Sequence, residues 1–148
     1  FDDLYESTAP MLYAFCLRIL QSREDAEDVV QQTYVNAWRA RRDFRGESRV
    51  STWLLTIARR LAYHTAKRRT EANARMPDEL AQAPSHVSER VAAEQAIARL
   101  PARMRVAITL YYLHDRTIDE TAKIMGVARG TVKAHLHTAR WRLRRELQ

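Results

Sequence analysis

The sequence predicts an all-α protein made of two small helical domains joined by a flexible linker, the second domain containing a helix-turn-helix. Only three glycines and four prolines occur among 148 residues, and a chain so poor in helix breakers and rich in Ala, Leu and Arg favours helix. Helical periodicity is lost only in residues 70–87, which contain Pro77 and Pro84. We therefore expect domains at residues 1–69 and 88–148, with residues 70–87 as the linker.

Two helices are predicted at the start of the chain. Residues 2–21 carry an apolar stripe, which Pro10 either kinks or restarts. Ser22 is suited to cap the next helix, because acids follow it at the positive end of the helix dipole. The inward face of this helix is expected to consist of Ala26, Val29, Val30, Thr33, Ala37 and Trp38.

The opposite face of this second helix is polar. Asp28, Gln31 and Gln32 lie at i, i+3 and i+4, so they fall together on one side. Such a surface is either an ordinary solvated face or a docking site for a protein partner.

A loop at residues 43–48 precedes a third predicted helix, which Ser48 or Ser51 would cap. Its core face is expected to hold Val50, Trp53, Leu54, Ile57, Leu61 and Ala62. Residues 48–70 contain six cations and no acid, interleaved with Trp53 and Tyr63. Single-stranded nucleic acid needs this combination, because bases stack on rings while cations bind phosphates. Alternatively, Trp53 is simply a core residue.

The second domain is predicted to begin with a helix capped by Ser88 and a second helix after Pro101. The inward residues of the first are expected to be Val91, Ala92, Ile97 and Leu100. The second is the most apolar helix of the chain, through Val106, Ile108, Leu110, Tyr111 and Leu113, and it is expected to form the core of this domain.

Residues 117–145 have the pattern of a helix-turn-helix. Thr117 and Glu120 form a capping box, Gly126 suits a left-handed turn, and a second helix begins near Ala128. That helix carries cations and no acid before Glu146, which suits the major groove of DNA. The alternative is a basic, solvated helix of an ordinary bundle.

Composition narrows the range of functions. A net charge of +7 favours a polyanionic partner. The single Cys16 predicts an inert, buried thiol in a reducing cytoplasm, and no apolar run is long enough to span a membrane. Neither metal-ligand spacing nor a catalytic constellation is found. We expect no cofactor, no metal, no enzymatic activity and no membrane insertion.

Four motifs in order, AEDVVQQTYVNAW, FRGESRVSTWLLTIAR, LPARMRVAITLYYL and GVARGTVKAHLHTAR, resemble the extracytoplasmic-function (ECF) sigma factors, which keep regions 2 and 4 of bacterial sigma factors. The resemblance covers almost the whole chain. It implies a subunit that binds core RNA polymerase and directs promoter-specific initiation of transcription. Such proteins are commonly held inactive by an anti-sigma factor.

The resemblance also implies roles for individual residues. Core polymerase would dock on Asp28, Gln31 and Gln32. Region 2 would pocket a flipped base and hold the melted minus-ten strand through Phe44, Arg45, Gly46, Glu47, Ser48, Trp53, Arg59, Arg60, His64, Lys67, Arg68 and Arg69. Region 4 would read duplex minus-thirty-five DNA through Arg129, Thr131, Lys133, Ala134, His135, His137, Thr138 and Arg140.

Several positions depart from the family pattern, which usually has Asn at Arg60 and often Asp at His64. Ala134 and His135 replace a common Ser-Arg pair, and Arg is frequent where Thr138 stands. Base preference therefore does not transfer from the family.

Two rival functions are open to such a chain. A stand-alone helix-turn-helix regulator would explain residues 117–145 but not the basic stretch at residues 48–70. A DNA recombinase or nuclease would need catalytic residues that the sequence does not supply.

Overall fold

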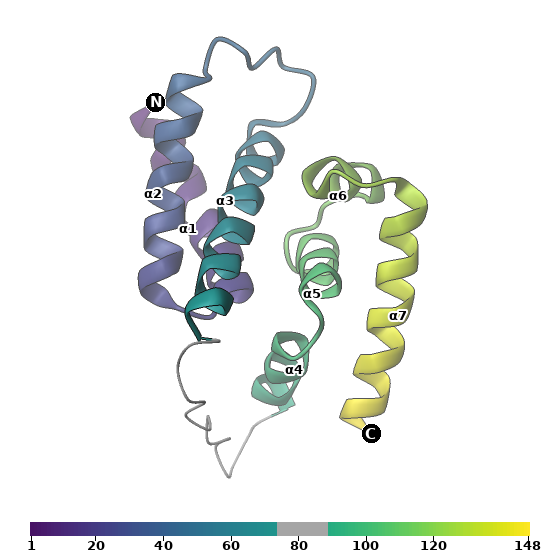
Figure 1. Cartoon of the computed structure of the whole chain (residues 1–148). Coiled ribbons are helices and arrows are strands. Elements are labelled where there is room, and N and C mark those ends of the chain that lie inside the picture. Colours follow the sequence, from purple (N-terminus) through teal and green to yellow (C-terminus); the bar gives the residue numbers. More distant parts are fainter. Residues whose placement is uncertain (74–88) are drawn as a thin grey trace.

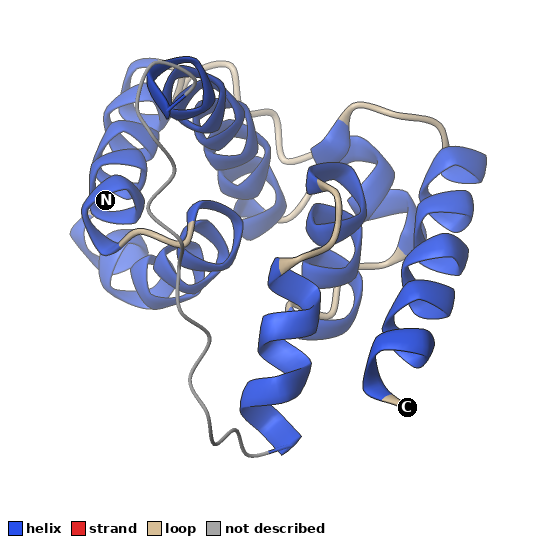
Figure 2. Cartoon of the chain, turned by 60° about the horizontal axis from the view of Figure 1, so that its bottom comes forward, coloured by secondary structure: helices blue, strands red, loops and turns tan. Residues whose placement is uncertain are grey.

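The computed structural model describes residues 1–73 and 89–148, and every regular element in these two ranges is a helix (Figures 1 and 2). The expectation of an all-α fold is confirmed. Most of the expected linker, residues 74–87, and the expected cap Ser88 lie outside the described residues. The elements are α1 (Asp2–Leu20), α2 (Arg23–Arg39), α3 (Val50–Asn73), α4 (Glu89–Ala98), α5 (Ala102–Ile108), the π-helix η1 (Thr109–Leu113), α6 (Ile118–Met125) and α7 (Arg129–Leu147).

Helices α1, α2 and α3 pack on one another and form the N-terminal unit. Helix α1 runs unbroken through Pro10 and ends at Gln21, whose backbone is left-handed. The Ser22 hydroxyl then accepts a hydrogen bond of 3.2 Å from the Asp25 amide, which confirms the predicted cap of α2. Buried apolar residues from all three helices fill the core, among them Leu12, Phe15, Ala26, Val30 and Leu54.

Helix α3 differs from its prediction at both ends. It begins at Val50, so the residue immediately before it is Arg49 and not Ser48, and Ser51 lies inside the helix. It also continues through Asn73, four residues into the segment expected to be linker. Leu55 and Ala58 are fully buried although neither was expected in the core, because α3 packs against α1 and α2 and also against α6 (Figure 1).

Helices α4 to α7 form the C-terminal unit. Leu100, Val106, Ile108 and Leu110 are buried in it as predicted. The helix expected over residues 102–115 instead widens into η1 after Ile108. A π-turn contains more residues than an α-turn, so an α-helical register does not hold to the end of this segment.

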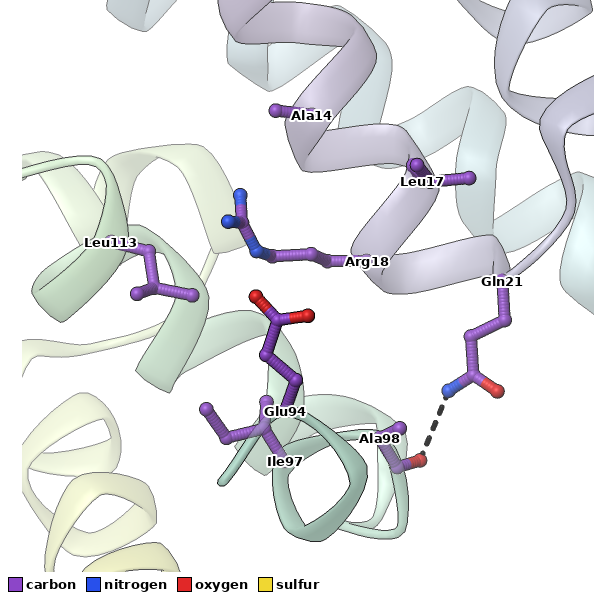
Figure 3. Close-up of a pocket in the computed structure, with 8 residues that line it drawn as sticks. All are labelled: Ala14, Leu17, Arg18, Gln21, Glu94, Ile97, Ala98 and Leu113. Carbon is purple, nitrogen blue, oxygen red and sulfur yellow. Dashed lines mark hydrogen bonds between the residues drawn. The ribbon is translucent and has the colours of Figure 1, made fainter. Parts of the chain in front are cut away.

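Two residues of this unit were wrongly assigned to the core. Leu113, in the last turn of η1, is 41% exposed, and Val91 in α4 is 42% exposed. Leu113 lies beside α1 and lines a groove between the two units, drawn in Figure 3.

The two units contact each other through α3 and α6, and through α1 with α5 and η1. The groove in Figure 3 lies along this boundary and has a volume of about 370 Å³. Gln21 donates a hydrogen bond of 3.1 Å across it to the carbonyl of Ala98. Nearby, Arg105 of α5 donates to the carbonyl of Ile19 at 3.2 Å.

Candidate nucleic-acid interface

The helix-turn-helix forms through strong local signals. The Thr117 hydroxyl accepts from the Glu120 amide at 3.0 Å, and the Glu120 carboxylate accepts from the Thr117 amide at 3.2 Å, so the predicted capping box is present. Gly126 ends α6 with a φ of 69°, and Ala128 precedes α7. Val132, Leu136 and Ala139 form the buried face of α7. This determines which face of the helix points outward.

The outward side of α7 carries the residues expected to read bases. Lys133, Ala134 and His137 are exposed together at i, i+1 and i+4. Among the described residues, Lys133 and His137 have neither a hydrogen-bond nor an ion-pair partner, so both can meet a ligand. Thr131 and Thr138 are half-buried at the edges of this surface.

Three other residues predicted to bind DNA from α7 either contact another side chain or are partly buried. Arg129 forms an ion pair of 2.7 Å with Asp119, and Arg140 donates to the Tyr112 hydroxyl at 2.8 Å. His135 is half-buried, and within the described residues its enclosed Nε2 has no hydrogen-bond partner. The ion pair leaves 62% of the Arg129 side chain exposed, so its remaining N–H groups can still meet a phosphate.

A second basic surface runs along α3. Arg60, His64, Lys67 and Arg68 are exposed at i, i+4, i+7 and i+8, which places them on one face of the helix. This face therefore presents the cations Arg60, Lys67 and Arg68 to a ligand.

Two cations predicted for this surface lie elsewhere. Arg69 donates to the carbonyl of Leu20 at 2.7 Å and forms an ion pair of 3.1 Å with Asp25, so it holds α3 to the end of α1. Arg59 is half-buried with its guanidinium over the ring of Tyr63, 5.0 Å from the ring centre. Burial lowers the pKa of Arg59, and its Nε has no partner among the described residues.

The loop before α3 is anchored by an aromatic contact. Phe44 lies against Trp53, with ring centres 4.8 Å apart and planes inclined by 30°. Arg45, Gly46 and Glu47 are exposed at the tip, and Gly46 adopts a φ of 74°. Trp53 is thus half-buried and supports the loop.

Helix α2 carries the third predicted surface. Asp28, Gln31 and Gln32 are exposed side by side, and Gln32 donates to the Asn36 side chain at 2.8 Å. The same face continues at Val35, which is 43% exposed, and Trp38, which is 49% exposed. Placing Trp38 in the core was therefore wrong, although the i, i+3, i+7, i+10 spacing of 28, 31, 35 and 38 could have shown its position.

The contact between α3 and α6 was not expected from the sequence. Arg49 donates to the Glu120 carboxylate through Nε at 3.0 Å and through Nη2 at 2.7 Å, and Thr52 donates to the same carboxylate at 2.7 Å. Arg116 donates to Ser51 at 2.8 Å. The absence of acids from residues 48–70 was the one available signal, because the cations there need acceptors from another element.

Buried titratable groups also lie within the fold. Burial raises the pKa of the Cys16 thiol to about 12, as expected of an inert cysteine. Burial, together with the charges of Arg18 and Arg116, lowers the pKa of His114 to about 4. His114 lies edge-on to Phe15 of α1 with ring centres 6.0 Å apart, so a neutral imidazole is packed between the units.

In the ranges that the structure describes, no group of three His, Cys, Asp or Glu side chains is arranged to hold a metal ion. Nor does either range contain a helix that is long and apolar enough to cross a bilayer.

Comparison with known proteins matches both units. The Sigma-70 region 2 model matches residues 4–72, and the Sigma-70 region 4 model matches residues 90–143. The ECF RNA polymerase sigma factor SigM of Mycobacterium tuberculosis is 32% identical over 151 residues, covering 99% of this chain and 76% of that protein. The ECF RNA polymerase sigma-E factor of Haemophilus influenzae is 32% identical over 149 residues, covering 86% of this chain and 77% of that protein.

A solved structure matches both units together. It contains the sigma factor RpoE of Bartonella quintana in complex with the anti-sigma factor NepR. The match has a TM-score of 0.82 and 28% identity, and it covers 99% of this chain and 96% of that chain. A score this high over both units requires that they are similarly placed in the two proteins.

Proposed function

The chain belongs to the ECF sigma factors of bacterial RNA polymerase, and we propose that its two units recognise different parts of a promoter with separate basic surfaces. Membership of this family makes the chain a factor that binds core RNA polymerase and directs promoter-specific initiation of transcription. The observation that carries the residue-level proposal is the pair of exposed faces on α3 and α7, one in each unit.

Region 4 would place α7 in the major groove of the minus-thirty-five element. Lys133 is suited to donate to guanine, and the short Ala134 can approach a thymine methyl group. His137 lies on the same exposed face. Arg129 and Arg140 lie nearer the edges, where cations serve phosphates rather than bases.

Region 2 would hold the melted minus-ten strand. Arg60, Lys67 and Arg68 are suited to bind its phosphates along α3, while the loop at Gly46 and Glu47 would take up one flipped base. Extracting a base costs a few kcal/mol of stacking and pairing. Base pocketing and phosphate contacts would offset this cost once polymerase holds the DNA in place.

The exposed face of α2 would dock on core polymerase through Asp28, Gln31 and Gln32. Its extension at Val35 and Trp38 supplies an apolar and aromatic centre of the kind that dominates binding energy at protein interfaces. Phosphodiester chemistry would belong to polymerase, which makes this chain a cytoplasmic binding factor rather than an enzyme.

An anti-sigma factor is the proposed regulator. The similar Bartonella sigma factor is captured with the anti-sigma factor NepR in an arrangement that aligns with both units of this chain. A protein that stabilises this arrangement would keep the α3 and α7 surfaces from acting on a promoter.

Run-off transcription with core polymerase tests the proposal. Initiation at a defined set of promoter fragments should require this chain and should fall about tenfold or more in Lys133→Ala, since one good base contact contributes about 1–3 kcal/mol. Arg90→Ala, which removes an exposed cation of α4, is the control and should initiate normally. Tight binding to a palindromic duplex without polymerase, and no initiation, would instead favour a stand-alone regulator.

A further inference from the structure

The contact between α3 and α6 joins the two units through one carboxylate. Glu120 of the helix-turn-helix accepts hydrogen bonds from Arg49 and Thr52 of the N-terminal unit. Arg116 approaches the same carboxylate at 3.7 Å and donates to Ser51 and Thr52. We call the ion pair at the centre of this network, between Arg49 and Glu120, the latch.

The latch closes α6 over the loop that would take up a flipped base. A groove of about 580 Å³ lies in front of that loop. Gly46, Glu47 and Ser48 line one wall, and Asp119 and Lys123 of α6 line the other. In this arrangement α6 occupies the space in front of the loop that an entering strand would need.

The same contact covers a cation of α3. The guanidinium of Arg59 lies beside the turn of the helix-turn-helix, 3.8 Å from the position that a Cβ at Gly126 would occupy. A guanidinium enclosed without a partner for its Nε is unfavourable, and opening of the units would release it. The closed arrangement therefore covers a strand-binding cation, and burying this cation makes the closed arrangement less stable.

Promoter geometry is incompatible with the latch. Elements named minus ten and minus thirty-five lie about 25 base pairs apart, which is roughly 85 Å along B-DNA. The latch holds the loop side of α3 and the helix-turn-helix together, with Arg49 and Glu120 only 2.7 Å apart. A chain engaged with both elements cannot keep this ion pair.

We propose that the latch is an autoinhibitory contact, which holds region 4 against the loop at residues 46–48 in the free chain and must open for promoter binding. Its consequence for promoters rests on the proposed function, whereas the closed state is a property of the chain alone. The Arg49 side chain is 58% exposed, so salt and competing polyanions can reach the pair.

Distances between two fluorescent labels on the full chain test the closed state. Arg39→Cys in α2 and Arg142→Cys in α7 supply exposed labelling sites, while buried Cys16, with its pKa raised to about 12, stays unlabelled. Arg49→Glu would set two acids against each other. It should raise the ratio of open to closed chains about fivefold or more. A fivefold change corresponds to about 1 kcal/mol, the upper end of the interaction free energy of an exposed ion pair.

A matched control separates the latch from a simple change in charge. Arg99→Glu removes an ion pair with Glu146 inside the C-terminal unit, and the Arg99 side chain is also 58% exposed. This variant should leave the label distances unchanged. Glu120→Gln, which keeps an acceptor for the capping box, is a second way to weaken the latch if Arg49→Glu folds poorly by circular dichroism.

The outcomes distinguish the latch from the proposed function. Label distances that are the same in the wild type, Arg49→Glu and Glu120→Gln would overturn the latch, even if the chain initiates transcription. Opening in these variants without initiation by any of them would support the closed state and overturn the proposed function. Opening accompanied by tighter binding of a short single-stranded oligonucleotide than in Arg99→Glu would support the autoinhibitory role.

Discussion

Glu120 takes part in both a local cap and a long-range contact. Burial alone would raise the pKa of its carboxyl, but hydrogen bonds from Arg49, Thr52 and the Thr117 amide, with the charge of Arg49, lower it from 4.5 to about 2. A carboxyl whose folded pKa is depressed adds stability above its ordinary pKa, and this is lost as the pH falls through about 2. At neutral pH the cap of α6 and the latch therefore share one ionised acceptor.

Gly126 offers a test of the turn at the residue scale. Its φ of 69° is unfavourable for a residue with a Cβ, whereas steric room is available, since the nearest atom to an added Cβ is 3.8 Å away. Gly126→Ala should lower the free energy of unfolding by about 1 kcal/mol through backbone strain alone. Urea denaturation followed by circular dichroism measures the change.

Gly130 is the matched control, because it lies in the first turn of α7 with open space around it and an ordinary helical backbone. Gly130→Ala should raise the free energy of unfolding by about 0.4–1 kcal/mol, since the unfolded chain loses freedom. A loss of similar size in both variants would contradict the assignment of strain to the turn at Gly126.

At the scale of single elements, local signals predicted the helices well. Ser22, Thr117 and Gly126 fix helix ends through groups within a few residues, so the sequence was enough to find them. The length of α3 was underestimated at its C-terminal end because Thr70 to Asn73 carry no apolar period. Helix α3 nevertheless continues there, and the Thr70 hydroxyl donates to the carbonyl of Ala66 at 3.0 Å.

The placement of a side chain was predicted less well where the side chain contacts an element that is distant in the sequence. Arg59 looks like a phosphate-binding cation in the sequence, but the turn at Gly126 covers it. Arg69 also looks like a phosphate-binding cation in the sequence, but it forms an ion pair with Asp25 of another helix. Periodicity identifies a polar side of a helix, but it does not show which other helix will cover that side.

The exposed face of α2 gives the element-scale prediction. Trp38→Ala should weaken binding of the full chain to core polymerase by about tenfold or more, as expected for an aromatic residue near the centre of an interface. Trp38 is 49% exposed, so the melting temperature should change little. Binding is measured by titration of labelled chain with core enzyme.

Trp141→Ala is the control for loss of an exposed indole, because Trp141 is 52% exposed on α7, in the other unit. If both variants bound polymerase as well as the wild type, the docking surface would not include the Val35 and Trp38 extension of α2.

At the scale of the whole molecule, the relative placement of the two units could not be predicted from the sequence. It depends on Arg49, Glu120, Arg105 and His114, whose partners lie more than 60 residues away in the chain or in the opposite unit. Family resemblance predicted two DNA-reading surfaces, but it did not indicate that α6 packs against α3.

The distribution of charge over the whole molecule leads to a final prediction. If α3 follows a single strand through Lys67 and Arg68, their joint replacement by Ala should reduce the dependence of log K on log salt by about 1.4, because each phosphate contact to a single strand contributes about 0.7. Binding of a minus-ten oligonucleotide at several salt concentrations measures this slope. Arg144→Ala with Arg145→Ala lowers the net charge of +7 by the same amount from the end of α7. This control should leave the slope unchanged, because contacts at α3, rather than the total charge, release the counterions. Equal reductions of the slope in both double variants would mean that binding of the strand depends only on the overall charge of the chain.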